Sequence, residues 1–252
     1  RHSERQKLVA ADGVANDQFG SAVALDGDTL AVGADRERGG QGAVYVFTRT
    51  GTAPNTAWAF QQKIFAADAA TNDSFGYSVA LSGDTLAVGT PNDDISHEDQ
   101  GSAYIFNRSS GRWTFQTKLL AADSVGLENF GSAVALDGDT VIVGAPRGKR
   151  NPSRSPNEGA AYVFTRTGTN WMFQAKLFAN DGEHDDFFGG AVALDSDTVA
   201  VGAPLDEIGT NLRQGSVYLF TRTGGLWSFR QKLLTEANPF AEFGRSVALA
   251  GV

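Results

Sequence analysis

Cysteine is absent from this chain of 252 residues. Its absence excludes disulfide bonds, thiolate nucleophiles and metal sites that depend on cysteine ligands. Histidine is also scarce, with three residues, and the sequence contains no Gly-x-Ser-x-Gly or His-Glu-x-x-His pattern. Because these patterns place the nucleophiles and bases of common hydrolases, we expect that the protein is not an enzyme.

Long apolar runs and an excess of positive charge are missing too. No run of about eighteen apolar residues exists, so the sequence predicts no membrane-spanning helix and no membrane insertion. The formal net charge is −8, whereas nucleic acids and anionic membranes attract proteins with a dominant cationic face. We therefore expect no nucleic-acid partner.

Glycine, in contrast, is abundant, with 30 residues, and some of it belongs to a repeated Phe-Gly pair. Successive pairs are separated by 56, 55, 58 and 55 residues, and their phenylalanines are Phe19, Phe75, Phe130, Phe188 and Phe243. A period of this length, with several strand-like segments in each repeat, is typical of propeller blades. The sequence therefore predicts an all-β fold, a β-propeller of four-stranded blades.

The first repeat shows how a blade is expected to form. Residues 21–25 and 29–33 are short apolar segments that predict the first two strands. They are separated by Asp26-Gly27, a dipeptide typical of two-residue type I′ hairpin turns. Residues 43–47 predict a third strand, and a fourth, outer strand is expected after a further turn.

The outer strand carries the four tryptophans of the chain. In the first repeat, period-two spacing places Trp58, Phe60 and Ile64 on one face of this strand. We expect the aromatic residues to pack between adjacent blades, and a platform for stacking sugar rings is the alternative. Lys63 alternates to the other face, which we expect to be solvated. The equivalent residues of the later repeats are Trp113, Trp171 and Trp227; Phe115, Phe173 and Phe229; and Lys118, Lys176 and Lys232.

Four complete blades fit the chain as one domain covering residues 1–252. We expect these blades at residues 19–67, 75–122, 130–180 and 188–234, with strands of a further blade at 5–10 and 243–252. Because such a partial blade exposes unpaired backbone groups, we expect further blades or another subunit to complete the propeller. The beginning Arg1-His2-Ser3, without an initiator methionine, indicates a processed protein or an excised segment.

Two recurring motifs carry a family resemblance. Besides the Phe-Gly pairs, Gly144-Ala145-Pro146 and Gly202-Ala203-Pro204 follow the second strands, with Gly33-Ala34-Asp35 and Gly89-Thr90-Pro91 as variants in the first two repeats. Over nearly the whole chain, the sequence resembles FG-GAP repeats, the blades of the integrin α-subunit head and of many secreted proteins. The resemblance implies a β-propeller that is extracellular or lies at the cell surface and serves adhesion or ligand binding.

Calcium loops are frequent in integrin-type blades, where alternating acidic residues surround the cation. The corresponding connection here is only the short turn from Leu25 to Thr29, which contains Asp26 and Asp28, and its copies in later repeats. Such a tight turn supplies too few oxygen atoms for calcium, so we expect these aspartates to stabilise the turn. We predict no cofactor, and a shallow calcium site is the alternative.

The variable loops between second and third strands are where function is expected to differ from blade to blade. The acidic loop of the second blade predicts contact with a divalent cation or a cationic partner, or a solvated loop; its candidate residues are Asp93, Asp94, His97, Glu98 and Asp99. The basic loop of the third blade predicts contact with a protein or glycan ligand that bears carboxylate, phosphate or sulfate groups. Its candidate residues are Arg147, Lys149, Arg150 and Arg154.

Two further patterns concern the remaining connections. Aspartates recur before the Phe-Gly pairs, as Asp12 and Asp17 do in the first repeat, and we expect them to cap local backbone groups. Asn72 and Asn107 each begin an Asn-x-Ser pattern, which predicts N-glycosylation if the protein is secreted by a eukaryotic cell.

Three functions follow from these observations. The leading hypothesis is a non-enzymatic extracellular propeller that mediates adhesion or binds a protein or carbohydrate through its rim loops. The alternative is a structural subunit of an extracellular assembly or filament, which the unfinished ends and the oppositely charged loops favour. A polysaccharide-acting enzyme with its site at the propeller mouth is the third hypothesis.

Overall fold

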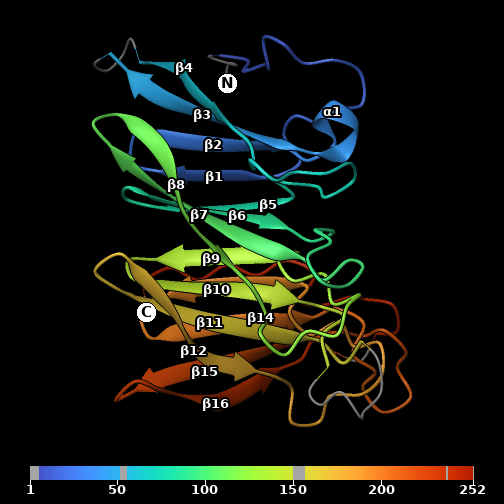
Figure 1. Ribbon diagram of the computed structural model, residues 1–252. Coiled ribbons are helices and arrows are strands. Elements are labelled where there is room, and N and C mark those ends of the chain that lie inside the picture. Colours follow the sequence, from blue (N-terminus) through green and yellow to red (C-terminus); the bar gives the residue numbers. More distant parts are fainter. Residues whose placement is uncertain (1–5, 52–55, 150–156, 237, 252) are drawn as a thin grey trace, which may run out of the picture.

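The computed structural model describes residues 6–51, 56–149, 157–236 and 238–251. Within these residues, sixteen strands form four antiparallel sheets of four strands each (Figure 1). Each sheet keeps its strands in sequence order, so every sheet is a simple meander. The predicted all-β architecture of four-stranded blades is confirmed, and the four sheets are called blades 1 to 4 below.

Blade 1 contains β1 (Val23–Asp26), β2 (Thr29–Ala34), β3 (Ala43–Thr50) and β4 (Ala57–Ile64), with the short helical turn α1 (Glu37–Gly40) between β2 and β3. Blade 2 contains β5 (Ser78–Ser82), β6 (Thr85–Thr90), β7 (Ser102–Ser109) and β8 (Arg112–Leu119). Blade 3 contains β9 (Ala133–Asp137), β10 (Thr140–Ala145), β11 (Ala160–Thr167) and β12 (Asn170–Leu177). Blade 4 contains β13 (Ala191–Asp195), β14 (Thr198–Ala203), β15 (Ser216–Thr223) and β16 (Leu226–Leu233).

The hairpin between the first two strands differs in detail from the predicted type I′ turn. Asp26 pairs with Thr29, so Gly27 and Asp28 are the two central residues of the turn. Of these two, only Gly27 has a positive φ, 54°. A single left-handed residue at the first central position is the requirement of a type II′ turn, which suits the strand twist as well as type I′ does.

Successive blades pack face to face. The face that a blade turns toward the following blade is called its outgoing face, and the opposite one its incoming face. At the first junction, Val46 and Ile64 on the outgoing face of blade 1 belong to one buried cluster with Phe75, Tyr104 and Phe106 of blade 2. The innermost strands β1, β5, β9 and β13 contact one another in this order (Figure 1). The hydrophobic core therefore consists of layers between the blades.

The two glycine motifs meet at these junctions. A Cβ atom added at Gly33, in β2 of blade 1, would lie 2.1 Å from the carbonyl oxygen of Gly76, in the Phe-Gly pair of blade 2. Gly76 itself has a φ of 90°. In the same way, a Cβ atom added at Gly89 would lie 2.0 Å from the carbonyl oxygen of Gly131. Real Cβ atoms do not approach a backbone oxygen so closely, so the repeated glycines are required by the packing of one blade on the next.

In the outer strand, the side chains do not lie on the faces predicted from the sequence. In β4, Phe60 pairs with Phe47 and Gln62 with Val46, so Gln61 is an extra residue that forms a β-bulge. The bulge reverses the alternation after Phe60. Ile64 therefore lies on the outgoing face, away from Trp58 and Phe60, and the prediction that these three residues share a face is wrong.

The lysine prediction fails for the same reason. The bulge brings Lys63 onto the incoming face, where its Nζ atom lies 4.8 Å from the centre of the Tyr45 ring. Lys63 also pairs with Asp12, with 2.7 Å between Nζ and Oδ2, and with Glu37. Lys63 and its counterparts Lys118, Lys176 and Lys232 therefore do not lie on a solvated face. They form ion pairs with the connections that precede their blades.

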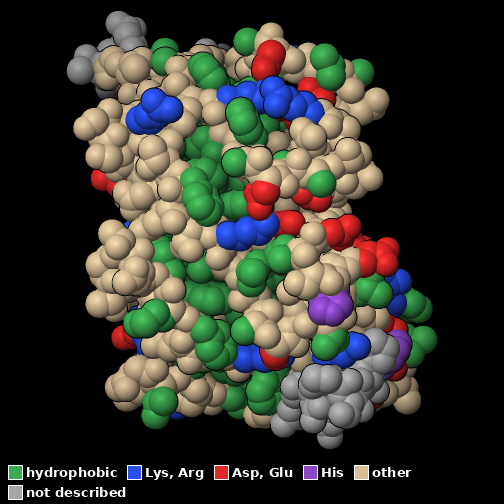
Figure 2. All heavy atoms as spheres, in the orientation of Figure 1, with side chains coloured by type: hydrophobic (Ala, Val, Ile, Leu, Met, Phe, Trp, Pro, Cys, Tyr) green, Lys and Arg blue, Asp and Glu red, His purple; other side chains and the backbone are tan. Residues whose placement is uncertain are grey.

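The aromatic residues of the outer strands divide into two groups. Trp113 is 2 % exposed within the junction of blades 1 and 2, and the other tryptophans are partly buried. Phe60, in contrast, is 58 % exposed, and its counterparts Phe115, Phe173 and Phe229 are exposed as well. The expected packing between blades thus holds for Trp113, Trp171 and Trp227, whereas Trp58 packs with the segment before blade 1. For these phenylalanines the expectation is wrong. Figure 2 shows one face of the molecule, on which hydrophobic side chains gather in a band across the successive sheets.

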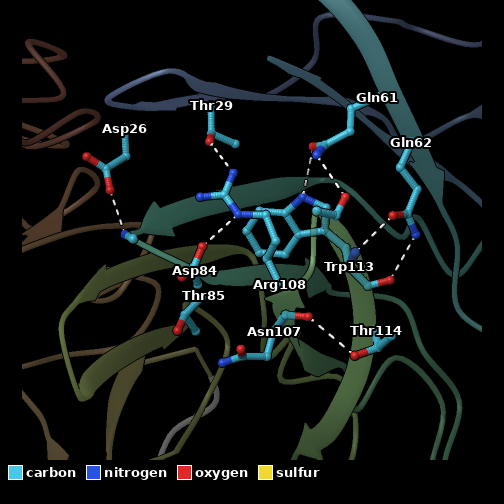
Figure 3. A network of polar contacts seen from close by, with 12 residues as sticks. Asp26, Thr29, Gln61, Gln62, Asp84, Thr85, Asn107, Arg108, Trp113 and Thr114 are labelled. Carbon is cyan, nitrogen blue, oxygen red and sulfur yellow. Dashed lines mark hydrogen bonds and ion pairs between the residues drawn. The ribbon is translucent and has the colours of Figure 1, made fainter. Parts of the chain in front are cut away.

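Polar contacts also join the blades (Figure 3). The side-chain amide of Gln62 donates to the Trp113 carbonyl oxygen, and the Trp113 backbone N–H donates to the Gln62 Oε1 atom, both at 2.9 Å. Arg108 of blade 2 donates from Nη1 to Thr29 Oγ1 of blade 1 at 2.7 Å, and a hydrogen bond of 2.6 Å from its Nε atom to Asp84 of its own blade orients it. These contacts fix the register between neighbouring sheets.

The segments before blade 1 and after blade 4 cover its two outer junction faces. Gln6 makes the same pair of hydrogen bonds to the Trp58 backbone that Gln62 makes to Trp113, at 2.9 and 2.8 Å. Leu8 and Ala10 pack on the incoming face of blade 1, and Val247 and Leu249 pack on the outgoing face of blade 4. Neither segment forms a strand within residues 6–10 and 243–251, in contrast to the expected strands at 5–10 and 243–252, of which residues 5 and 252 lie outside the described residues. A single parallel bridge joins Phe243 to Gly215.

Candidate ligand-binding site

The described parts of the connections between second and third strands lie at one end of the molecule, opposite the tight hairpin turns (Figure 1). A hollow of about 470 Å³ opens at this end. Its walls come from two kinds of position, the residues that follow the second strands and the residues that flank the Phe-Gly pairs. The volume falls within the range of small-molecule sites.

Arg147 and Phe187 form one wall of this hollow. The guanidinium carbon of Arg147 lies 6.0 Å from the centre of the Phe187 ring, a cation–π distance that orients the guanidinium group. Among the described residues, Arg147 has no carboxylate partner. Phe187 has a φ of 58°, which is an outlier for a bulky side chain.

Amide and hydroxyl groups form another wall. The Nδ2 atom of Asn129 donates to the carbonyl oxygen of Pro91 at 3.1 Å and to Asn92 Oδ1 at 3.2 Å. Ser132 Oγ donates to the Asn129 carbonyl oxygen at 2.8 Å. These contacts hold the side chains in fixed orientations while the Ser132 hydroxyl oxygen retains lone pairs that can accept a hydrogen bond.

Three further side chains line the hollow. Tyr77, directly after the Phe-Gly pair of blade 2, is 48 % exposed. Arg245 is ion-paired with Glu242, a carboxylate that it shares with Arg213. Asp99 is the single carboxylate among the described residues that line the hollow. Tyr77, Asn129, Phe187 and Arg245 were not predicted as site residues. Tyr77, Phe187 and Arg245 differ in residue type from the equivalent positions of other repeats, and this was the signal that could have found them.

The candidate residues of the acidic loop lie in different surroundings. Asp93 is 5 % exposed and accepts a hydrogen bond from Ser102 Oγ at 2.5 Å, and its Oδ2 atom lies 2.7 Å from Lys118 Nζ. Asp93 is therefore part of the blade packing and is not presented to a partner. Asp99, by contrast, reaches the hollow.

The rest of the acidic loop is exposed and lies against the segment before the third Phe-Gly pair. The Leu127 backbone N–H donates to the Glu98 carbonyl oxygen at 2.7 Å, and a Cβ atom added at Gly126 would lie 2.8 Å from the Cβ atom of His97. Asp94 accepts a hydrogen bond from the Asp99 backbone N–H at 2.8 Å. These contacts fix the loop without bringing its acidic side chains into one cation site.

The basic loop is placed only in part. Arg147 lines the hollow, and the carbonyl oxygen of Lys149 accepts a hydrogen bond from Lys176 Nζ at 2.7 Å. Arg150 and Arg154 lie outside the described residues. Arg147 is thus the described residue of this loop that reaches the hollow.

A repeated cluster of tyrosine, lysine and carboxylate groups lies beside the connections between blades. In blade 2, Tyr104 donates to Asp68 at 2.8 Å and Lys118 donates to Asp68 at 2.9 Å. Burial opposes ionisation of Asp68, but the hydrogen bonds from Lys118 and Tyr104 outweigh it and lower its pKa. Burial raises the pKa of Tyr104, so its hydroxyl remains a donor. Asp68 therefore fastens the connection onto the next blade, and the prediction that aspartates at this position cap local backbone groups is wrong for it.

The carboxylates nearest to the Phe-Gly pairs do cap the backbone as expected. Asp17 accepts from the Val14 N–H at 2.7 Å, and Asp73 accepts from the Ala70 N–H at 2.6 Å. The equivalent Asp186 is 1 % exposed, and burial, together with the charge of Asp206, raises its pKa to about 7. These carboxylates are structural elements of the connection.

The hairpin aspartates are engaged by protein groups. Asp28 accepts from Arg49 Nε at 2.7 Å, and Asp26 accepts from the backbone N–H of Gly83 in the next blade at 2.6 Å. Across the described parts of the chain, no group of three or more histidine, aspartate or glutamate residues has metal-binding geometry. The shallow calcium site remains an untested alternative.

The two predicted glycosylation sites differ in position. Asn72 is exposed beside the β2–β3 connection of blade 1, where its backbone N–H donates to the Gly39 carbonyl oxygen at 3.3 Å. Asn107 lies within β7 and pairs with Thr85 on one side and Thr114 on the other. The glycosylation of both residues remains a prediction.

Comparison with protein families gives one match. The family model described as FG-GAP repeat matches residues 2–47, 58–106, 113–164 and 171–220, which is most of the chain. A search of curated proteins gives no match. Among the helices that the structure describes, none has the length and apolar character needed to cross a membrane.

Proposed function

The chain belongs to the FG-GAP repeat family, and from this premise we propose that it is part of a β-propeller that binds a ligand without chemical conversion. The binding site is the hollow beside Arg147, at the loop end of the blades. We propose that the propeller acts outside the cell or at its surface, in adhesion or in recognition of a protein or carbohydrate. The ordinary use of this family supports the second proposal.

The observation that carries the binding function is the composition of the hollow. The strands of the four blades are nearly identical in sequence, but Tyr77, Phe187 and Arg147 contribute side chains that the repeat does not require. Cationic, aromatic and amide groups on a rigid sheet scaffold are typical of specific ligand sites. The function therefore depends on the loop end, and the sheets supply the scaffold.

Closure of the propeller is also a proposal. Thr29, Thr85 and Thr140 each accept a hydrogen bond from an arginine of the following blade, at 2.7, 3.0 and 3.0 Å. Thr198 occupies this position in blade 4, and none of the described residues donates an equivalent bond to it. We propose that a further blade, from this or another polypeptide, packs on the outgoing face of blade 4.

A binding screen tests the proposed function. The purified chain is applied to arrays of glycans and of extracellular proteins, beside the variant Tyr77→Ser, which restores the residue found at the equivalent positions Ser21 and Ser132. We expect a specific ligand that the variant binds at least about tenfold more weakly. Turnover of a bound glycan, or binding that the variant leaves unchanged, would contradict the proposal.

The alternative of a structural subunit is tested by the state of the chain in solution. Sedimentation velocity at high protein concentration and low salt distinguishes the two functions. A monomeric particle is expected for a ligand-binding propeller. Growth into filaments, abolished by salt, would favour an assembly held by oppositely charged loops.

A further inference from the structure

Resting on the proposed function, we infer that the hollow recognises a sugar that bears a carboxylate group, such as a uronic or sialic acid. Two features together point to this class of ligand. A guanidinium group without a carboxylate partner among the described residues faces the hollow, and aromatic and hydroxyl-binding groups stand beside it. A carboxylated sugar is the ligand that uses all of these groups.

Arg147 supplies the site for the carboxylate. Its side chain is exposed, and the Phe187 ring orients its guanidinium group at 6.0 Å. A planar guanidinium group held in one orientation can donate two parallel hydrogen bonds to a carboxylate. The other arginine of the hollow, Arg245, contacts the Glu242 carboxylate, which it shares with Arg213, whereas no described carboxylate contacts Arg147. Arg147 is therefore the anion-binding residue.

Phe187, whose ring contacts the Arg147 guanidinium group, has a strained backbone conformation of its own. The equivalent residues before the other Phe-Gly pairs are Gln18, Ser74, Asn129 and Glu242, all of them polar and all with positive φ. A bulky aromatic residue is disfavoured there, whereas asparagine tolerates this conformation. A residue whose backbone conformation lowers the stability of the fold, and which lines a pocket, indicates a function in that pocket.

The remaining groups suit a sugar ring better than a peptide. Tyr77 offers an exposed aromatic surface that can contact the apolar face of a pyranose. Asn92, Asn129 and Ser132 present fixed amide and hydroxyl groups to hydroxyl substituents. Recognition of an extended peptide commonly uses a free strand edge, and the lining of the hollow consists of loop and turn residues instead.

The direct test is titration calorimetry at pH 7 and low salt with a small panel of sugars. The acidic probes are trigalacturonate, triguluronate, trimannuronate and 3′-sialyllactose, and the neutral controls are their methyl esters and lactose. We expect at least one acidic probe to bind, about tenfold or more tightly than its neutral control, and to lose affinity with added salt.

Matched variants test whether the acidic probe binds in the hollow. Arg147→Gln is expected to lower affinity for the acidic probe about tenfold or more, and to remove the preference over the methyl ester. Arg36 occupies the equivalent position in blade 1 and lies outside the hollow, so Arg36→Gln is expected to leave affinity unchanged. Asp99→Asn removes the carboxylate of the lining and is expected to raise affinity severalfold.

Phe187→Asn separates positioning from folding. Because asparagine accepts a positive φ, the variant is expected to fold with a melting temperature at or above that of the parent chain, and to bind the acidic probe severalfold more weakly. Unchanged affinity in the folded variant would overturn the role of Phe187. Binding of neutral and acidic sugars alike, or no binding of any acidic probe, would overturn the inference. The proposed function would survive if the arrays still gave a ligand sensitive to Tyr77→Ser.

Discussion

Asp186 lies in surroundings that favour its protonated form. Its side chain is buried, it accepts a hydrogen bond from the Glu183 backbone N–H at 2.7 Å, and both Asp206 and Lys232 face it. Its pKa of about 7 exceeds the value near 4 of an unfolded chain. The folded state therefore binds more protons than the unfolded state between about pH 4 and pH 7, and this group's contribution to stability falls as the pH rises through that range.

Asp186→Asn tests this expectation because asparagine keeps a hydrogen-bond acceptor but cannot ionise. At pH 8 the free energy of unfolding of the variant is expected to exceed that of the parent chain by roughly 2–4 kcal/mol, and the difference should vanish toward pH 4. Urea denaturation at several pH values measures it. Glu236→Gln, which alters an exposed carboxylate, is the control. A difference that is the same at all pH values would show that ionisation of Asp186 is not responsible.

At the scale of the strand, the outer edge of each blade is defined by its bulge. The extra residue in β4 lets Gln62 reach the next blade while Lys63 turns to the opposite face. Sequence periodicity did not predict this, since an ideal strand alternates without interruption. The bulge recurs in β8, β12 and β16, so it belongs to the repeat.

Gln62→Ala measures the polar contact between two outer strands. The substitution removes two hydrogen bonds to the partly buried backbone of Trp113 and is expected to lower the free energy of unfolding by about 1–3 kcal/mol. The measurement is chemical denaturation at pH 7.

The chain offers a matched control for this variant. Gln231 holds the equivalent position in β16, is exposed, and makes no contact with a following blade in the described residues. Gln231→Ala is therefore expected to change stability by less than about 0.5 kcal/mol. Equal losses in both variants would mean that the effect arises within the strand and not at the junction.

At the scale of the molecule, the blades form a linear series, and the main contacts among the described strands run between consecutive blades. Blades 2 and 3 pack between two sheets, whereas blades 1 and 4 each have one sheet as a neighbour. In such arrays, stability is approximately a sum of unit and junction contributions, so units at the ends open more readily.

Hydrogen exchange of the 252-residue chain tests this arrangement. Backbone amides of β6, β7, β10 and β11 are expected to exchange about tenfold or more slowly than those of the corresponding strands in blades 1 and 4. Mass spectrometry of peptic fragments resolves the blades. Uniform protection of all four blades would contradict a stepwise opening and indicate a single cooperative unit.

The repeat and its strands were determined by the sequence alone, because Phe-Gly pairs, turn dipeptides and apolar runs are local features that recur at a fixed period. Their number, order and sheet topology follow from that period. The acidic Asp93 and the lysine Lys63 were misplaced, since burial and bulges depend on contacts made across a junction. Local patterns do not contain those contacts.

Only the tertiary structure decided which residues meet at the loop end. Tyr77, Arg147 and Phe187 belong to three different repeats, separated by 70 and 40 residues in the chain, and the stacking of blades brings them around one hollow. The sequence marks Tyr77 and Phe187 as departures from the repeat, while Arg147 shares its residue type with Arg36 of blade 1. The distances between the three residues follow from how one sheet is placed on the next. The scaffold is therefore specified by local periodicity. The site is specified by the way neighbouring blades pack at the junctions, where glycines of one blade contact glycines of the next.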